Sequence, residues 1–287
     1  MSGKPLARRR GHVLQDLFGR RDRVLIGVVH LLPLPGAPDY DGKGIQAICD
    51  RALKDASAYA KAGFDGLIVE NHGDIPFAKP ADIGPETAAH MAVAAERIHR
   101  ETALPMGINV LANAALHALA VASASGAAFI RVNQWANAYI ANEGLIEGAA
   151  PEAMRYRSRL QARNIRIFAD AHVKHGAHAL VQDRPLAELV RDVEFFNADV
   201  VIATGQRTGH AADLDYIRSF KKATSLPTLV GSGVTADNVN DILAIVETHP
   251  TDFITSPWLR LVRQWRRSCS RACRPRCHQE CRSGPSG

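Results

Sequence analysis

Short runs of apolar residues recur along the chain, and longer segments with apolar residues at helical spacing separate most of them. A continuous apolar run of about four to eight residues is typical of a strand that is buried on both faces of a parallel sheet. The runs predict seven strands, at 24–30, 66–70, 105–109, 129–133, 166–173, 200–204 and 226–230. The intervening segments predict helices at 45–62, 85–102, 113–125, 151–163, 185–196 and 214–223, with a further amphipathic segment at 239–246. Asn113 is placed to cap the third of these helices.

Alternating strands and helices joined by short loops indicate a parallel sheet, and an eighth unit would close it into a (β/α)₈ barrel. A doubly wound sheet is the alternative architecture. The loop at 31–38 argues against it, because this first strand-to-helix connection is rich in proline and lacks the glycine fingerprint of a dinucleotide site. The barrel is therefore the predicted fold, and residues 24–255 are its predicted domain.

The two ends of the chain differ from this domain. Residues 1–23 are basic and carry apolar side chains spaced for a short helix that could cover the bottom of a barrel. Residues 256–287 form a tail rich in Arg and Cys that we expect to be disordered. No apolar run reaches the ~20 residues of a membrane span, so the sequence predicts a cytoplasmic protein without an integral membrane segment.

The net charge of +6 suggests nucleic-acid binding until its position is considered. Residues 257–287 hold eight Arg and one Glu, which accounts for the whole positive balance, and the remaining chain is close to neutral. Cys49 is the only cysteine outside the tail, so no disulfide framework is indicated. We expect a small-molecule ligand rather than nucleic acid, in a protein that could form a homo-oligomer.

Polar residues mark the end of each predicted strand. In (β/α)₈ barrels these ends form one mouth, where active sites lie. The seventh strand runs into Gly231-Ser232-Gly233, where glycine lets backbone N–H groups approach an anion and the following helix N-terminus adds its positive end. This turn predicts half of a phosphate site. The other predicted substrate-binding residues are Asn109, Arg131, Asn133, Thr204 and Gly205.

The predicted catalytic residues are His30, Glu70, Asp170, His172 and Lys174. Alternation along a strand would place the last three on one face, where a carboxylate, an imidazole and an ammonium could exchange protons. An ion-pair network that only orients the loop is the alternative. Lys174 could also form a Schiff base. The cofactor is unknown, and a divalent metal held by His30, Glu70 and His172 is a further alternative; His72 and Asp74 are weaker candidates.

Several stretches together resemble the BtpA family, which includes SgcQ-type proteins. They lie at 26–36, 66–77, 129–133, 172–175, 204–209 and 229–234. The resemblance implies a barrel of the phosphate-binding type. It also implies an association with photosystem I biogenesis in cyanobacterial members and with sugar-metabolism operons in others, and it supplies no catalytic assignment.

The tail departs from the family pattern after residue 254, where members continue into a glycine turn and a final helix. We hypothesise a frameshift near codons 254 to 256, which would leave the eighth unit truncated. Translation of the other frames should then restore a glycine turn and an amphipathic helix. Cys269, Cys273, Cys277 and Cys281 could instead form a metal or redox module, but their even spacing fits a zinc site poorly. A nucleic-acid-binding arm is the third alternative.

Two functions follow from these patterns. The first is an enzyme that acts on a small phosphorylated metabolite, such as a sugar phosphate or nucleotide derivative, by isomerisation, carbon–carbon cleavage or glycosidic cleavage. The second is a non-catalytic assembly or regulatory factor that keeps a ligand pocket and serves photosystem I biogenesis.

Overall fold

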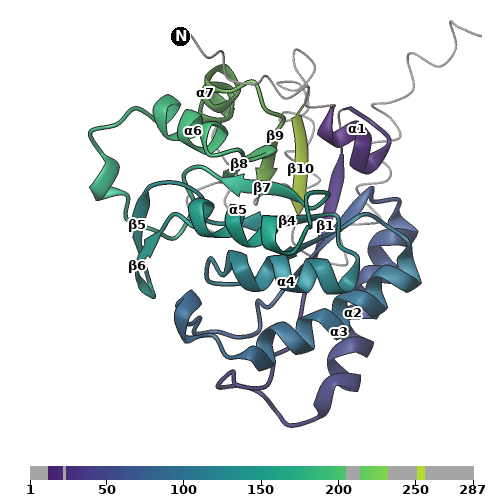
Figure 1. Cartoon of the computed structure of the whole chain (residues 1–287). Coiled ribbons are helices and arrows are strands. Elements are labelled where there is room, and N and C mark those ends of the chain that lie inside the picture. Colours follow the sequence, from purple (N-terminus) through teal and green to yellow (C-terminus); the bar gives the residue numbers. More distant parts are fainter. Residues whose placement is uncertain (1–11, 22–23, 205–213, 232–250, 256–287) are drawn as a thin grey trace, which may run out of the picture.

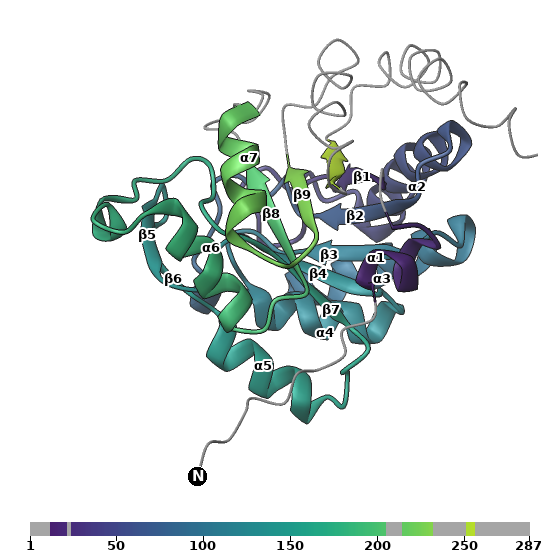
Figure 2. The same ribbon diagram turned by 90° about the horizontal axis from the view of Figure 1, so that it is seen from above.

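A closed barrel of parallel strands forms the centre of the chain in the computed structural model, which describes residues 12–21, 24–204, 214–231 and 251–255 (Figures 1 and 2). Eight strands of these described residues close the barrel, as predicted. In order around it they are β1 (Leu25–His30), β2 (Gly66–Glu70), β3 (Met106–Asn109), β4 (Phe129–Val132), β7 (Arg166–Asp170), β8 (Val200–Thr204), β9 (Thr228–Gly231) and β10 (Thr251–Thr255).

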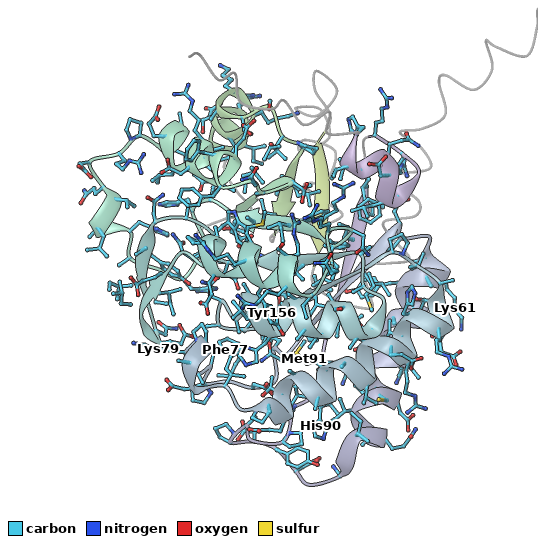
Figure 3. The ribbon with its side chains drawn as sticks, viewed as in Figure 1. Lys61, Phe77, Lys79, His90, Met91 and Tyr156 are labelled. Atoms are coloured by element: carbon cyan, nitrogen blue, oxygen red, sulfur yellow. The ribbon has the colours of Figure 1, made fainter. Side chains whose placement is uncertain are left out.

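Helices cover the outside of this barrel (Figure 2). They are α2 (Gly44–Ala62), α3 (Pro85–Thr102), α4 (Ala115–Ser125), α5 (Ala150–Arg159), α6 (Leu186–Phe195) and α7 (Leu214–Ala223), and short 3₁₀ turns lie at Pro80–Asp82 and Ala179–Val181. Most of these helices are amphipathic and pack their apolar side inward. On α3, for example, Met91 is fully buried whereas the adjacent His90 is partly exposed (Figure 3). None of the described helices is both long and apolar enough to cross a membrane.

A short N-terminal helix, α1 (Val13–Phe18), closes the bottom of the barrel. Its Val13 and Leu14 belong to the same apolar cluster as Phe129 and Phe168, which stack inside the barrel with ring centroids 4.2 Å apart. Phe18 meets the Phe129 ring edge-on at 6.0 Å. The predicted covering helix is therefore part of the core at the amino-terminal end of the strands.

The eighth barrel strand is β10, and its described part ends at Thr255. β10 pairs with β9 on one side and with β1 on the other, where Leu25 lies opposite Phe253. The predicted truncation concerns the chain beyond Thr255, and that segment lies outside the described residues.

Three local predictions were wrong. The long loop after β4 contains an antiparallel hairpin, β5 (Ala138–Ala141) and β6 (Gly144–Glu147). The strand predicted at 166–173 ends at Asp170. Asn113 does not cap α4, because its Oδ1 accepts from the Gln134 backbone N–H at 2.8 Å and its Nδ2 donates to the Glu147 carbonyl at 3.1 Å. Asn113 therefore ties the hairpin to the start of α4.

Candidate functional site

A cavity of about 420 Å³ opens at the carboxyl ends of the strands. Five of the predicted site residues line it, namely His30, Glu70, Arg131, Asn133 and Lys174. The hairpin β5–β6 and the loop after β2 form further parts of the cavity wall. The hairpin contributes Tyr139 and Glu143, and the loop contributes His72 and Phe77. The cavity therefore lies where ligands bind in barrels of this kind.

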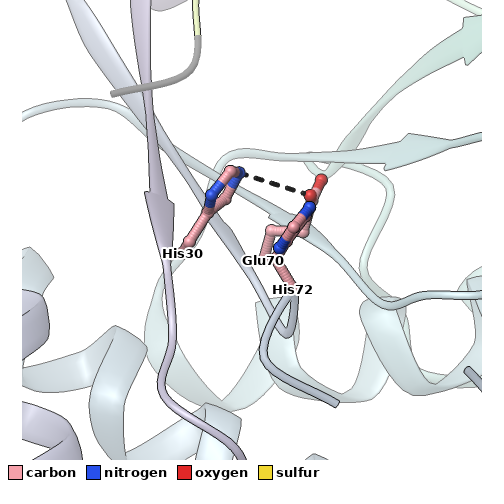
Figure 4. Close-up of side chains that lie close together, drawn as sticks. All are labelled: His30, Glu70 and His72. Atoms are coloured by element: carbon pink, nitrogen blue, oxygen red, sulfur yellow. Dashed lines mark ion pairs between the residues drawn. The ribbon is translucent and has the colours of Figure 1, made fainter. Parts of the chain in front are cut away.

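One half of the cavity is built by β1, β2 and β3. Glu70 at the end of β2 is 7% exposed, and its Oε2 accepts a hydrogen bond from Asn109 Nδ2 at 2.6 Å. Its Oε1 lies 3.6 Å from His30 Nε2 (Figure 4). His30 in turn stacks on His72, with ring centroids 4.2 Å apart and an interplanar angle of 12°. These strand ends therefore gather two imidazoles around one buried carboxylate.

Burial lowers the pKa of His30, and Glu70 opposes this by raising it. His72 and Lys174 lower the pKa further, and the net direction is downward. The imidazole of His30 is therefore favoured in its neutral form, in which one ring nitrogen can accept a proton or ligate a metal.

The other half is built by β4 and β7. Arg131 donates from Nε and Nη2 to the two carboxylate oxygens of Asp170, at 3.2 and 3.0 Å, and both residues are buried. Burial alone would lower the pKa of Arg131, but Asp170 raises it, so the guanidinium stays charged. Asn133 Nδ2 also lies 3.4 Å from Asp170 Oδ2. Asp170 is thus committed to a fork-shaped ion pair.

Lys174 brings a second positive charge to the same cavity. Its pKa is lowered to about 8, first by burial and then by the neighbouring charge of Arg131. Glu70 and Asp170 oppose this shift. No salt bridge within 4.0 Å joins the Lys174 ammonium to a carboxylate of the described residues. The side chain is therefore placed to meet an anionic ligand or to exchange a proton near neutral pH.

His172 does not join this group, contrary to the predicted alternation of Asp170, His172 and Lys174. Because β7 ends at Asp170, the chain turns after it. The His172 ring stacks on His178 at 3.8 Å, and its Nδ1 lies 3.3 Å from the Tyr216 hydroxyl. The sequence also predicted a metal site formed by His30, Glu70 and His172. In the structure the side chain that lies with His30 and Glu70 is His72, not His172.

The Thr204 hydroxyl is hydrogen-bonded to the backbone of the loop after β7. Its Oγ1 donates to the His172 carbonyl at 3.3 Å and accepts from the Lys174 backbone N–H at 3.2 Å, so it holds the loop that carries Lys174. Gly231 ends β9 beside Arg131, because a Cβ added there would lie 3.6 Å from Arg131 Nη2. The predicted phosphate-binding residues Gly205, Ser232 and Gly233 lie outside the described residues.

Three buried amide oxygens have no hydrogen-bond partner among the described residues, namely Asn109 Oδ1, Asn133 Oδ1 and Gln134 Oε1. Buried polar atoms in folded proteins nearly always have partners, so such atoms at a cavity indicate a place for a ligand or for water. Asn133 lines the cavity itself. Its open acceptor therefore supports the predicted role of Asn133 in ligand binding.

His72 and Tyr139 both line the cavity, although the sequence predicted His72 only as a weaker candidate and did not predict Tyr139. His72 directly follows Asn71, which anchors the loop: Asn71 Oδ1 accepts from the Leu111 N–H at 2.7 Å, and Asn71 Nδ2 donates to Asp74 Oδ2 at 2.9 Å. A polar run immediately after a buried strand was a usable signal for His72. Tyr139 gave no such signal, because it enters the cavity from a hairpin that was predicted as a loop.

A family profile and individual relatives both indicate the same protein family. The profile of the BtpA family matches residues 21–261. A protein of Pyrococcus abyssi is 42% identical over 236 residues, which cover 82% of this chain and 87% of that protein. The photosystem I biogenesis protein BtpA of Synechocystis is 39% identical over 220 residues, which cover 76% of this chain and 75% of that protein.

Two solved structures that share this fold are enzymes with low sequence identity to this chain. N-(5'-phosphoribosyl)anthranilate isomerase from Pyrococcus furiosus superposes with a TM-score of 0.53 at 14% identity, over 87% of this chain and 99% of that one. Orotidine 5'-monophosphate decarboxylase from Methanocaldococcus jannaschii gives a TM-score of 0.52 at 14% identity, over 88% and 96% of the two chains. These likenesses show the barrel fold.

Proposed function

This chain belongs to the BtpA family, and from that premise we propose that it is an enzyme acting on a small phosphorylated metabolite, a sugar phosphate or a nucleotide derivative. The names of the two structural neighbours support this ligand class, since one is a phosphoribosyl isomerase and the other an orotidine monophosphate decarboxylase. The reaction belongs to lyase, isomerase or hydrolase chemistry.

The observation that carries the proposal is the juxtaposition of charges in the cavity. Arg131 is already paired with Asp170, and Glu70 accepts from Asn109, whereas no carboxylate of the described residues forms a salt bridge with Lys174. The Lys174 ammonium is therefore the cationic group with which an incoming anion would pair. Gly231 lies beside Arg131, and Ser232 and Gly233 follow it directly in sequence, which supports a phosphate position near this end of β9.

The other polar groups have roles that fit proton transfer. Lys174, with a pKa near 8, can act as general acid or base, and His30 can accept a proton. Asn133 offers to a ligand hydroxyl a carbonyl oxygen that has no hydrogen-bond partner among the described residues. Asp170 and Asn109 position Arg131 and Glu70, so we assign them to support of the site rather than to contact with the substrate.

A ligand screen by thermal unfolding tests the proposal. A ligand that binds only the folded protein raises the melting temperature, so we expect stabilisation by members of a panel of phosphorylated sugars and nucleotides but not by their unphosphorylated counterparts. Lys174→Met should weaken that binding about ten- to a hundred-fold, because a charge-assisted contact is lost. Lys61→Met is the matched control, since Lys61 is exposed on the outer helix α2 (Figure 3).

Failure of every phosphorylated compound to stabilise the protein would count against the proposal. Equal weakening by Lys61→Met would show that the effect is not specific to the cavity. Turnover of a stabilising compound, followed by phosphorus NMR, then separates catalysis from binding alone.

A second function has one observation in its favour, the name of the Synechocystis relative as a photosystem I biogenesis protein. In that case the chain is a non-catalytic assembly factor. Expression in a Synechocystis strain that lacks its own BtpA tests this. Restoration of photosystem I by wild type and by Lys174→Met alike supports the factor, and restoration by wild type alone supports a role that needs the cavity.

We further propose a cytoplasmic location and a small-molecule partner rather than nucleic acid. The near-neutral charge of the chain outside residues 257–287 supports the small-molecule partner, because it provides little electrostatic attraction for nucleic acid.

A further inference from the structure

Three ligand-type side chains converge at the β1–β2 side of the cavity. His30, Glu70 and His72 each offer one nitrogen or oxygen atom, and these atoms all lie within 4.8 Å of one another (Figure 4). Divalent first-row metals bind imidazole nitrogen and carboxylate oxygen at about 2.0–2.2 Å, so two ligand atoms at a tetrahedral angle around one ion lie about 3.3–3.6 Å apart. Ligand atoms that lie up to 4.8 Å apart must therefore approach each other by about 1 Å, which rotation of a side chain supplies.

We propose that His30, Glu70 and His72 bind one divalent first-row transition metal ion, with its remaining coordination positions open to the cavity. Two imidazoles and one carboxylate are the donors of several metal sites that keep open positions for water or substrate. Closed structural sites instead surround the ion with four protein ligands. The three side chains line the cavity, which fits an open site.

The surroundings of the cluster are those of a supported metal site. Asn109 donates to Glu70 Oε2 at 2.6 Å, which fixes the carboxylate. The remaining oxygen, Oε1, faces His30 at 3.6 Å, a separation too long for a good hydrogen bond. An oxygen held in place without a close partner is what an ion would use. Outer contacts that orient a ligand in this way contribute to metal affinity.

The loop that carries His72 is fixed on both sides. Asn71 bonds to both backbone groups of Leu111, at 2.7 and 3.2 Å, and Asp74 Oδ1 accepts from the Leu34 N–H at 2.8 Å. These bonds join the loop after β2 to the loops after β1 and β3. His72 is therefore held beside the strand ends rather than placed there by chance contact.

One feature of the pair of histidines must change when a metal binds. An imidazole ligates a metal close to its ring plane, and the rings of His30 and His72 are stacked at 12° to each other. Both rings cannot point at one ion in that pose, so one ring turns on binding. His72 is partly exposed on its loop, and we expect its ring to be the one that turns.

The proposal concerns metal binding alone and does not rest on the proposed function. Mn²⁺ is the suitable probe for the full chain. The four cysteines at positions 269, 273, 277 and 281 would compete for Zn²⁺, whereas thiolates are poor ligands for Mn²⁺. The protein is stripped with a chelator and titrated with Mn²⁺, and free Mn²⁺ is followed by electron paramagnetic resonance.

We expect one Mn²⁺ per chain, and at least a ten-fold loss of affinity in both Glu70→Gln and His72→Ala. Glu70→Gln keeps an acceptor for Asn109, and His72 is partly exposed, so both variants should fold, which near-ultraviolet circular dichroism checks. His90→Ala is the histidine control, because His90 lies on the outer helix α3, where its Nδ1 contacts the Glu86 carbonyl of the same helix (Figure 3). Its affinity should be unchanged.

The proposal is overturned if the wild-type chain binds no Mn²⁺, or if folded His72→Ala binds it as tightly as wild type. Equal loss in His90→Ala overturns it as well, since the ion would then depend on histidines outside the cavity. Because no phosphorylated compound enters this assay, its outcome is independent of the ligand screen.

Discussion

His172 and Lys174 are two residues apart, yet they occupy different environments. Lys174 interacts electrostatically with Arg131 and Glu70 in the cavity, whereas His172 stacks on His178 and meets the Tyr216 hydroxyl. The sequence predicted that both were at the mouth of the barrel, because both follow a buried strand. It could not predict their separation, which depends on where β7 ends and on a partner side chain from α7, 44 residues away in sequence.

The pH dependence of stability should report on His172. Burial, and then the nearby His178, lowers the pKa of His172 from 6.5 to about 4. Above pH 6.5 the residue is neutral in both the folded and the unfolded chain. Between pH 6.5 and about 4 only the unfolded chain takes up the proton, so the free energy of unfolding should fall across this window.

Urea unfolding at a series of pH values measures this fall. His172→Phe keeps an aromatic ring for the stack on His178 but cannot be protonated, so its stability should depend less on pH between 6.5 and 4 than that of wild type. His90→Phe serves as the surface comparison. An unchanged pH slope in His172→Phe would contradict the assignment.

At the scale of the element, strands and long helices followed from apolar periodicity, and α3 and β8 lie at the predicted boundaries. The hairpin β5–β6 could not be predicted from apolar periodicity, because tertiary contacts rather than a local sequence pattern stabilise it. Tyr139 and Ile146 pack against Val173 in a small apolar cluster, and Gly144, the first residue of β6, follows the turn with a φ of 100°. Neither Val173 nor the turn geometry could be assigned to the hairpin from spacing alone.

The helix α1 gives a prediction at this scale. Leu14 is fully buried in the cluster at the bottom of the barrel. Truncation of a buried leucine to alanine typically costs about 2–5 kcal/mol, so Leu14→Ala should lower the free energy of unfolding by that amount. Gln15→Ala, on the exposed side of the same helix, should change it by less than about 0.5 kcal/mol. Chemical denaturation of both variants is the measurement, and equal effects would mean that α1 does not stabilise the core.

At the scale of the whole molecule, the site consists of two groups of side chains, and each group comes from a different set of neighbouring barrel strands. β1, β2 and β3 bring His30, Glu70 and Asn109, and β4 and β7 bring Arg131 and Asp170. The sequence predicted that these residues share one end of the barrel. Which carboxylate pairs with which donor was not predictable, because strand order and side-chain direction around the barrel decide it.

The pair of Arg131 and Asp170 should stabilise the whole barrel, since it joins two adjacent strands in a buried position. Removal of one partner leaves the other charge buried and unpaired, so Arg131→Met should cost about 3–5 kcal/mol. The double variant Arg131→Met with Asp170→Leu removes both charges and should be more stable than Arg131→Met. A double-mutant cycle by urea unfolding measures the coupling, and strictly additive effects would argue against a coupled pair.

Closure of the barrel by β10 has a consequence for how the chain folds during synthesis. β1 is the first strand of the barrel to leave the ribosome, and β10 is its last described partner. One edge of β1 therefore stays unpaired until nearly the whole polypeptide has emerged, and sheets completed by such distant pairing fold slowly and expose their edges meanwhile. A change in the gene near the codons of β10 would thus alter the pairing of β1, the strand at the opposite end of the sequence that carries His30.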